Sequence, residues 1–226
     1  GERSAELTRQ LLAFARKQTV APRPLDLNAT IADQLKLLGR LIGEHLALRW
    51  LPGAGLPLVK MDPAQVNQIL TNLAVNARDA IPGRGTLTVE TSHLIVTPED
   101  TFDELEIGPG HYLVLAVSDD GCGMDRDTRA HIFEPFFTTK PTGQGTGLGL
   151  STVYGIVRQC NGFLNVYSEL GSGSVIRVYL PIHESGPATD DEKAAAPPVR
   201  GGSETILVAE DEASVRQLLD TVLTEA

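Results

Sequence analysis

The chain has 226 residues, of which 42% are hydrophobic and 21% charged, so it can bury a core and is not globally disordered. Its formal net charge of −10 argues against nonspecific binding to nucleic acid or anionic membranes. No apolar run reaches the roughly 18 residues of a membrane span. No signal peptide is visible and neither cysteine belongs to a CxxC pair. We therefore expect a cytoplasmic protein with reduced thiols, while an anchor elsewhere in a longer protein stays open.

The first part of the chain predicts helices separated by short strands. Residues 4–18 have apolar side chains at i, i+4 and i+7, the pattern of an amphipathic helix, and residues 20–24 break it. A second helix is expected after Asn28 as N-cap. A third is expected at Asp62-Pro63, because aspartate caps helices and proline is favoured at the first helical position. Two short strands fit residues 47–51 and 58–61.

The middle of the chain predicts a sheet with one helix inserted. Strands are expected at 86–96, 112–118, 163–168 and 175–180, and a helix at 146–160. Gly171-Ser-Gly173 divides the last two strands and indicates a hairpin. Strands and helices thus alternate within one α/β domain of residues 20–183.

The end of the chain has a different organisation. Residues 184–203 combine Gly, Pro and Ala with an acidic run and lack hydrophobic periodicity, which indicates a flexible linker. A short buried strand at 205–209 and an amphipathic helix follow. Because one strand and one helix cannot close a core, residues 204–226 are expected to begin a further domain.

Glycines alternate along residues 143–149, at Gly143, Gly145, Gly147 and Gly149. Such a stretch can approach a ligand closely and expose backbone N–H groups, because no Cβ stands in the way. An apolar run from Leu148 follows, so the loop leads into a helix N-terminus, which favours anions such as phosphate. Taken alone, a plain linker remains an alternative.

Three other features point toward a nucleotide. Asn72, Asn76 and Asp79 share a face of the third expected helix, where amides can hold phosphate oxygens and a hydrated metal, although a solvated face is the alternative. Asp119 ends a strand and can accept a hydrogen bond from the exocyclic amine of adenine; an ordinary turn is equally typical there. Lys140 ends Phe133-Glu-Pro-Phe-Phe-Thr-Thr-Lys and fits a mobile cation near phosphates, or a solvated lysine.

These motifs, in this order and spacing, resemble the catalytic ATP-binding domain of sensor histidine kinases from two-component systems. The resemblance assigns an N box, a first glycine box, an F box, a second glycine box and a last glycine turn to residues 72–79, 119–123, 133–140, 143–149 and 171–174. It implies a two-layer α/β sandwich with a mixed sheet, the Bergerat-type ATP-binding fold, with ATP beneath a glycine-hinged lid.

The resemblance also implies roles for individual residues. Asn76 is expected to coordinate Mg²⁺, Asp119 to bind the adenine amine, and Asn72 and Lys140 to act near the phosphates. Asp79 stands where many sensor kinases carry a lysine or arginine, so we expect it to make a polar contact one step removed from the nucleotide. The full set implied to bind ATP is Asn72, Asn76, Asp79, Asp119, Gly121, Gly123, Lys140, Gly143, Gly145, Thr146, Gly147, Leu148, Gly149 and Ser174.

The flanking segments resemble other parts of such kinases. Residues 1–19 resemble the end of the second dimerisation helix, and residues 204–226 the start of a receiver domain with Glu210 and Asp211 as its metal-binding acids. This implies a homodimeric hybrid kinase that transfers phosphate to a histidine of its own dimerisation domain, for relay to a receiver or response regulator. None of the five histidines has the helical, acid-flanked setting expected of that phosphoacceptor.

Other functions were weighed against this one. A Rossmann dehydrogenase and a P-loop enzyme are excluded because neither glycine pattern occurs. ATP hydrolases of the gyrase and mismatch-repair type resemble the chain but carry a glutamate base where Asn72 stands, and an amide cannot accept a proton from water. A binding module that has lost its nucleotide is disfavoured by the intact Asn76, Asp119 and glycines.

Overall fold

The computed structural model describes residues 21–97, 107–141 and 145–182, which all belong to one compact unit ending at Glu184. The described helices are α2 (Leu27–Ile42), α3 (Pro63–Ala80), α4 (Arg126–His131) and α5 (Gly149–Gln159). The described strands are β1 (Arg23–Leu25), β2 (Leu46–Leu51), β3 (Val59–Met61), β4 (Gly85–Val96), β5 (Gly110–Asp119), β6 (Phe163–Glu169) and β7 (Gly173–Pro181).

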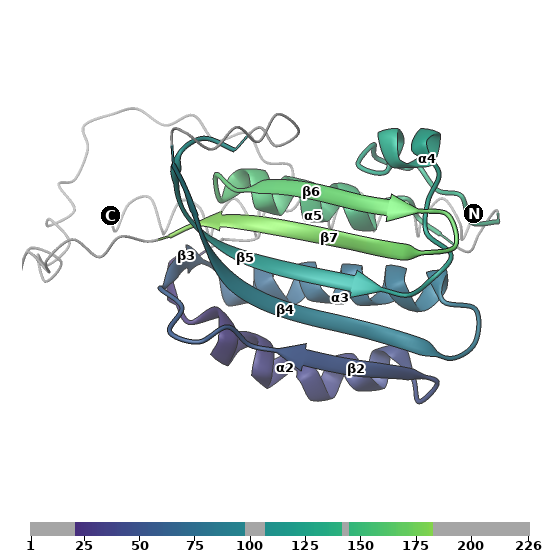
Figure 1. Ribbon diagram of the computed structural model, residues 1–226, viewed down its shortest axis with the longest axis horizontal. Coiled ribbons are helices and arrows are strands. Elements are labelled where there is room, and N and C mark those ends of the chain that lie inside the picture. Colours follow the sequence, from purple (N-terminus) through teal and green to yellow (C-terminus); the bar gives the residue numbers. More distant parts are fainter. Residues whose placement is uncertain (1–20, 98–106, 142–144, 183–226) are drawn as a thin grey trace, which may run out of the picture. The chain divides into compact units, whose positions relative to one another are not determined.

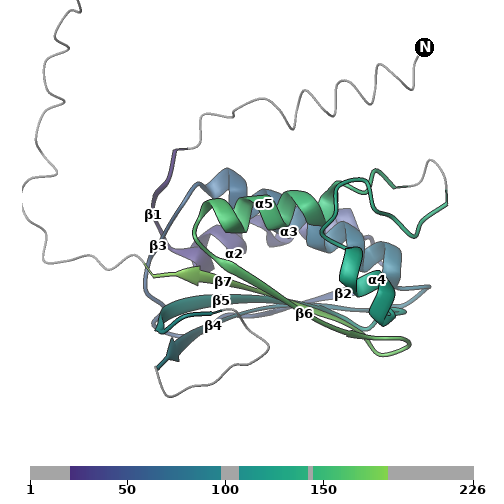
Figure 2. The same ribbon diagram turned by 90° about the horizontal axis from the view of Figure 1, so that it is seen from above.

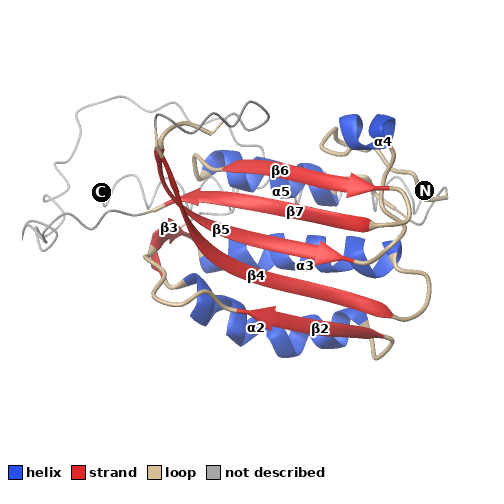
Figure 3. Ribbon diagram, viewed as in Figure 1, coloured by secondary structure: helices blue, strands red, loops and turns tan. Residues whose placement is uncertain are grey.

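Five strands form one mixed sheet in the order β2-β4-β5-β7-β6 (Figures 1 and 3). β2 runs parallel to β4, and every other neighbouring pair is antiparallel. Helices α2, α3 and α5 lie on the same side of this sheet (Figure 2), and β1 pairs with β3 in a separate two-stranded sheet. The predicted two-layer α/β sandwich with a mixed sheet is therefore confirmed.

Helix α3 occupies the middle of the helical layer and packs against both α2 and α5. The Asp62 carboxylate caps it by accepting the N–H of Ala64 at 2.8 Å, and Pro63 opens its first turn, as the sequence predicts. Most of its apolar face is buried: Val66, Ile69, Leu70, Leu73, Ala74 and Ala77. Since these side chains fix the rotation of the helix, Asn72, Asn76 and Asp79 are directed to one common side.

Three local expectations were wrong or incomplete. Asp26, rather than Asn28, caps α2 by accepting the N–H of Ala29 at 3.1 Å. The Asn28 amide instead donates to the Gly53 carbonyl at 2.8 Å and accepts from the Thr91 hydroxyl at 2.6 Å. Both residue types cap helices well, and tertiary contacts decide between them. The short elements β1 and α4 were not predicted, because neither is long enough to show a periodic pattern.

Strand β5 contributes buried side chains to the main hydrophobic core along most of its length. Leu113, Leu115 and Val117 alternate along it and are buried in the main hydrophobic core. The strand registers set Asp119 opposite Leu87 of β4 and Ser174 of β7. The last residue of β5 is thus held between two neighbours in the interior of the sheet.

The flanking segments predicted at 1–19, 184–203 and 204–226, and Gly143 of the glycine loop, lie outside the described residues, so these predictions remain open. Within the described ranges, none of the helices combines the length and apolar character required to cross a bilayer.

Candidate functional site

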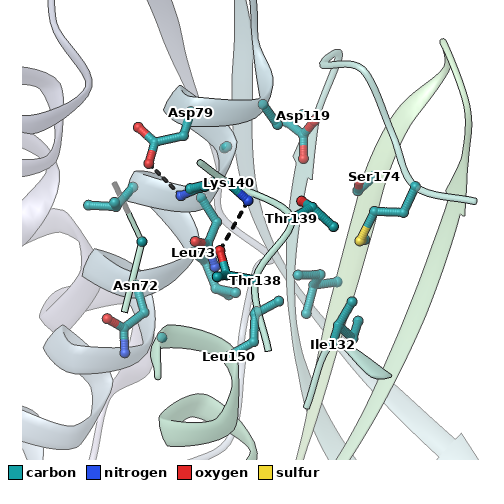
Figure 4. Close-up of a pocket in the computed structure, with 18 of the residues that line it drawn as sticks. Asn72, Leu73, Asp79, Asp119, Ile132, Thr138, Thr139, Lys140, Leu150 and Ser174 are labelled. Atoms are coloured by element: carbon teal, nitrogen blue, oxygen red, sulfur yellow. Dashed lines mark hydrogen bonds and ion pairs between the residues drawn. The ribbon is translucent and has the colours of Figure 1, made fainter. Parts of the chain in front are cut away.

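A cavity of about 470 Å³ lies among α3, the ends of β5 and β7, and the segments 122–124, 137–140 and 145–150 (Figure 4). Its volume is within the roughly 300–1,000 Å³ of small-molecule sites. Its walls include apolar side chains from six elements or loops: Leu73, Val117, Met124, Ile132, Leu150 and Ile176.

The cavity brings together residues that the sequence singled out from distant positions. Those that line it are Asn72, Asn76, Asp79, Asp119, Gly123, Lys140, Gly145, Thr146, Gly147, Gly149 and Ser174. Gly121 and Leu148 are not among the residues that line it. The Gly121 N–H donates to the Asp119 carboxylate, and Leu148 is the N-cap of α5.

Asp119 lies at one side of the cavity with its carboxylate held by the backbone. Its Oδ1 accepts the N–H of Gly121 at 2.9 Å, and the Ser174 N–H also donates to it. Burial raises the pKa of Asp119 above its ordinary value, the nearby Asp120 adds to this, and the two N–H groups offset part of it. The carboxylate is therefore poorly solvated and suited to accept a further donor from a ligand.

Asp120, its neighbour, has a different task. Its Oδ1 accepts the N–H of Thr86 at 2.8 Å at the start of β4. Asp120 does not line the cavity, whereas Asp119 does. The two adjacent acids therefore have different roles: Asp120 holds the start of β4, and Asp119 lines the cavity.

The glycines around Asp119 are required by close backbone packing. A Cβ on Gly123 would lie 1.9 Å from the carbonyl oxygen of Glu169, and one on Gly173 would lie 2.0 Å from that of Asp119. A Cβ on Gly121 would lie 2.7 Å from the Ala80 carbonyl oxygen at the end of α3. The structure thus gives these glycines a role in shaping the turn, besides the room for a flat base that the sequence suggests.

Asn72 lies across the cavity from Asp119 (Figure 4). In the described part of the chain, the Nδ2 atom of Asn72 is buried without a hydrogen-bond partner, a state that costs free energy unless a ligand relieves it. A Cβ on Gly149 would lie 3.9 Å from the Asn72 and Asn76 Oδ1 atoms and 3.7 Å from the Asn76 Nδ2. Both amides therefore face the first residue of α5.

The N-terminus of α5 adds to these donors. Leu148, its N-cap residue, makes no side-chain capping bond, so the first N–H groups of the helix are left for a ligand. Together with the positive end of the helix dipole, they favour an anion, such as a phosphate, beside the two amides.

Asp79 and Lys140 connect α3 to the segment after α4. Lys140 Nζ lies 2.6 Å from Asp79 Oδ2, and the Arg78 guanidinium bonds Asp79 Oδ1 at 2.8 Å and 2.9 Å. Burial raises the pKa of Asp79, but the hydrogen bonds from Lys140 and Arg78 outweigh it and hold the pKa below its ordinary value. Lys140 was expected as a mobile cation; here it is paired.

The sequence of residues 61–184 matches the family model described as histidine kinase-, DNA gyrase B-, and HSP90-like ATPase. The chain belongs to this ATPase family. The cavity is lined by the N-box amides, by the aspartate at the end of β5 and by glycines of the loop before α5. These are the features on which the resemblance to sensor histidine kinases rests.

The relatives are sensor kinases. The chain is 42% identical over 221 residues to the sensor kinase CckA of Brucella abortus, covering 95% of the chain and 23% of CckA. It is 33% identical over 183 residues to the sensor histidine kinase ZraS of Escherichia coli, covering 80% of the chain and 36% of ZraS. The chain thus spans well under half of these relatives, and what it shares with them includes a histidine kinase ATP-binding catalytic domain.

Solved structures agree on the fold. Full-length ShkA in complex with AMPPNP matches 72% of this chain and 31% of its own, with a TM-score of 0.57 and 26% identity. The mycobacterial sensor histidine kinase MprB matches 72% of this chain and 99% of its own, with a TM-score of 0.56 and 24% identity. The ATPase-family fold therefore extends over the described domain.

Most of the apolar side chains that line the cavity were not predicted from the sequence. Val117 and Ile176 face each other in the β5–β7 register, and strand alternation could have placed them on the helix-facing side. Met124, Ile132 and the Thr138–Thr139 pair lie in irregular segments. No periodic pattern marks such residues, so only the fold could bring them to an ATP-family cavity.

Gly147→Ala is expected to weaken binding of the ATP analogue AMPPNP by about tenfold or more. Gly147 has a φ of +66°, and a Cβ would lie 2.3 Å from the carbonyl carbon of Phe136. A left-handed backbone costs an L-residue about 1–2 kcal/mol, and the overlap adds to it by separating the loop from Phe136, whose N–H donates to the Gly147 carbonyl at 2.9 Å. Titration calorimetry measures the change.

Gly155→Ala is the matched control. Gly155 is exposed within α5, and a Cβ there would have no atom within 4 Å. Alanine at an open helical position stabilises by about 0.5–1 kcal/mol, so this variant should unfold at a slightly higher temperature and bind AMPPNP as the wild type does. Wild-type affinity in Gly147→Ala would contradict the packing argument.

Proposed function

We propose that this chain carries the ATP-binding catalytic domain of a hybrid sensor histidine kinase. It transfers the γ-phosphate of Mg·ATP to a histidine on the dimerisation domain of the same protein, for relay to an aspartate of a receiver or response regulator. The observation that carries the proposal is the polarity of the cavity, with a half-buried acceptor at Asp119 on one side and the unpaired Nδ2 donor of Asn72 on the other.

Adenine fits the Asp119 side. Its exocyclic amine donates to the carboxylate, and its flat ring lies against apolar neighbours such as Val117, Met124 and Ile176, which line the same cavity. Because the carboxylate already accepts two backbone N–H groups, its orientation is fixed before a ligand binds. Such preorganisation limits the entropy lost on binding.

The phosphates fit the opposite side. The N–H groups at the start of α5 and the buried Nδ2 of Asn72 supply neutral donors, and Lys140 supplies a cation at the cavity wall. Phosphoryl transfer depends mainly on positioning and on stabilising charge at the equatorial oxygens. Fixed donors of this kind meet both needs.

A magnesium ion fits the amide side chains. The Oδ1 atoms of Asn72 and Asn76 both lie 3.9 Å from the position of a Cβ on Gly149, so both amides offer a neutral oxygen near the first residue of α5. Among the described residues, no group of three or more His, Cys, Asp or Glu side chains could form a complete metal cage. Mg²⁺ commonly takes few protein ligands and completes its shell with water and phosphate oxygens, and when bound it would neutralise charge on the leaving diphosphate.

The reaction forms a bond between a histidine ring nitrogen and the γ-phosphorus and breaks the bond from that phosphorus to the bridging oxygen, which leaves with ADP. Water competes as nucleophile only if a base removes its proton. Asn72 stands at the N-box position where the hydrolases carry glutamate, and an amide is no base. Asn72 therefore favours transfer over hydrolysis.

The similarity to CckA supports the proposed flanking domains. It covers 95% of the chain and thus extends beyond the family match at 61–184. We propose that residues 1–19 end a dimerisation helix, residues 184–203 form a linker and residues 204–226 begin a receiver. The full-length protein would then be a cytoplasmic or membrane-anchored homodimer.

The experiment incubates the chain with γ-labelled ATP and Mg²⁺, alone and with a separately produced dimerisation domain that carries its phosphoacceptor histidine. The added domain should gain an acid-labile, alkali-stable label. The chain alone should stay unlabelled. Of the described histidines, His45 lies in a turn, His93 and His111 lie in strands, and His131 ends a six-residue helix and bonds Glu134. His183 precedes Glu-Ser-Gly-Pro, a sequence that disfavours a helix.

Two results would contradict the proposal. Rapid release of inorganic phosphate without transfer would identify an ATP hydrolase. Acid-labile label on the chain alone, mapped to one of its own histidines, would show that the acceptor lies within it.

A further inference from the structure

We propose that Asp79 is a positioning residue, which holds the Lys140 ammonium at the cavity wall where it meets the phosphates of the nucleotide. The inference rests on the proposed function, since it concerns how this site recognises a triphosphate. A carboxylate beside a polyanion is unfavourable by itself, so its presence in the cavity wall needs a physical reason.

Asp79 and Lys140 form a direct ion pair. Asp79 Oδ2 accepts from Lys140 Nζ at 2.6 Å, across a separation of 61 residues in sequence. The two side chains are 26% and 32% exposed, so the pair lies at the cavity wall rather than in bulk solvent. An ammonium has three N–H donors. One is directed at Asp79, and the other two are available to phosphate oxygens.

The Asp79 carboxylate is itself held by a neighbouring side chain. Its Oδ1 accepts two bonds from Arg78, at 2.8 Å and 2.9 Å. Arg78 in turn donates to the Leu41 carbonyl at 3.3 Å, in the last turn of α2. The carboxylate is therefore fixed by two packed helices, whereas Lys140 stands in a segment without regular secondary structure. Asp79, on α3, therefore positions Lys140.

Asp79 neutralises only part of the positive charge beside it. Asp79 lies between two cations, so the group of Arg78, Asp79 and Lys140 carries a net charge of about +1 when each has its usual ionisation. Asp79 thus cancels one positive charge while it orients the other toward the cavity. Neutralising Asp79 leaves more positive charge but a free lysine chain, and these two effects predict opposite changes in affinity. We expect orientation to prevail, because a free lysine loses rotamer entropy when it binds.

Lys140 lies beside the glycine loop. A Cβ on Gly145 would lie 3.2 Å from Lys140 Cδ and 3.4 Å from its Cβ. The loop from Gly145 leads into the N-terminus of α5, where the phosphates are proposed to bind. The lysine stem therefore lies along the backbone that approaches the same phosphates.

The test measures binding of AMPPNP with Mg²⁺ and of adenosine to the 226-residue chain by titration calorimetry. The variants are Asp79→Asn, Asp79→Glu, Lys140→Ala and the double variant Asp79→Asn/Lys140→Ala. Asp33→Asn is the matched control, because Asp33 is an exposed carboxylate on α2 outside the cavity. Thermal unfolding without ligand reports any loss of structure.

Asp79→Asn should lower AMPPNP affinity about fivefold, the size expected from a partly exposed ion pair, and leave adenosine affinity unchanged. Asp79→Glu should restore most of the loss. In the Lys140→Ala background, Asp79→Asn should have no further harmful effect, because Asp79 acts through the lysine.

Other results would overturn the inference. Wild-type AMPPNP affinity in Asp79→Asn would show that the pair does not orient Lys140 for binding, and tighter binding would show that Asp79 restrains the lysine from the nucleotide. An equal loss for AMPPNP and adenosine would assign Asp79 a structural role. A wild-type chain that binds neither ligand would overturn the proposed function and this inference with it.

Discussion

Asp119→Asn is expected to lower the affinity for ATP by about 10- to 100-fold, because a hydrogen bond to a charged group contributes about 1.5–3 kcal/mol. The Asn side chain keeps an oxygen for the Gly121 N–H group, so the turn should retain most of its structure. What is lost is the charge that we propose receives the adenine amine. Titration calorimetry with AMPPNP measures the loss.

Inosine triphosphate separates this loss from a general defect, because it carries a carbonyl oxygen where adenine carries the amine. The wild type should bind it far more weakly than ATP, since that oxygen would face the Asp119 carboxylate. In Asp119→Asn the amide can donate to the carbonyl, so the preference for ATP should shrink. A wild-type ratio of the two affinities in the variant would contradict adenine recognition by Asp119.

The pH dependence provides a second measurement on Asp119. Burial and the nearby Asp120 raise its pKa, so it takes up a proton at a higher pH than an ordinary aspartate, whose pKa is about 3.9. Adenosine binding by the wild type should therefore weaken on acidification before the pH reaches that value. Asp119→Asn should lack this dependence.

The same raised pKa predicts the sign of a stability change. The folded state binds the proton more tightly than the unfolded state, so the free energy of unfolding falls as the pH rises through the raised pKa. At neutral pH the ionised Asp119 is therefore a cost. Without nucleotide, Asp119→Asn should unfold at a slightly higher temperature at pH 7, and this gain should disappear once the pH is below the ordinary value.

Local signals were sufficient to predict the main elements. Asp62-Pro63 marks the start of α3 correctly because cap and first-turn chemistry depend on adjacent residues. The β-rich runs around β4, β5, β6 and β7 gave the central strands. The parallel pairing of β2 with β4 could not be derived from the residues, because it depends on which strand edge remains free after the hairpins have formed.

Some residues of the candidate site could likewise be predicted from the sequence, and others could not. Asp119 and the amides on α3 could be singled out because a strand end and a helical face show in the order of residues. The Asp79–Lys140 pair could not, since 61 residues separate its partners and each taken alone fits a solvated charge. The steric reason for Gly123 and Gly173 also depends on backbone contacts with Glu169 and Asp119 that only the folded chain creates.

Asn76→Ala is expected to remove the Mg²⁺ dependence of AMPPNP binding and to lower the rate of phosphotransfer by about 100-fold. The Asn76 amide lies near the first residue of α5, where we propose that Mg²⁺ binds, and a bound metal contributes several kcal/mol of charge stabilisation at phosphates. Removing the Asn76 amide oxygen leaves Asn72 alone, in a site without a carboxylate cluster among the described residues. AMPPNP affinity is compared with Mg²⁺ and with EDTA.

Asn67→Ala is the control for this variant, because Asn67 is another asparagine on α3 and does not line the cavity. In the described structure its Oδ1 is buried without a hydrogen-bond partner, so truncation relieves that cost while it opens a small void. The Asn67 variant should retain both transfer and the response to Mg²⁺. If Asn76→Ala bound AMPPNP more tightly with Mg²⁺ than with EDTA, by the same factor as the wild type, the metal would have to be held without Asn76. The amide side chains would then serve only as phosphate donors.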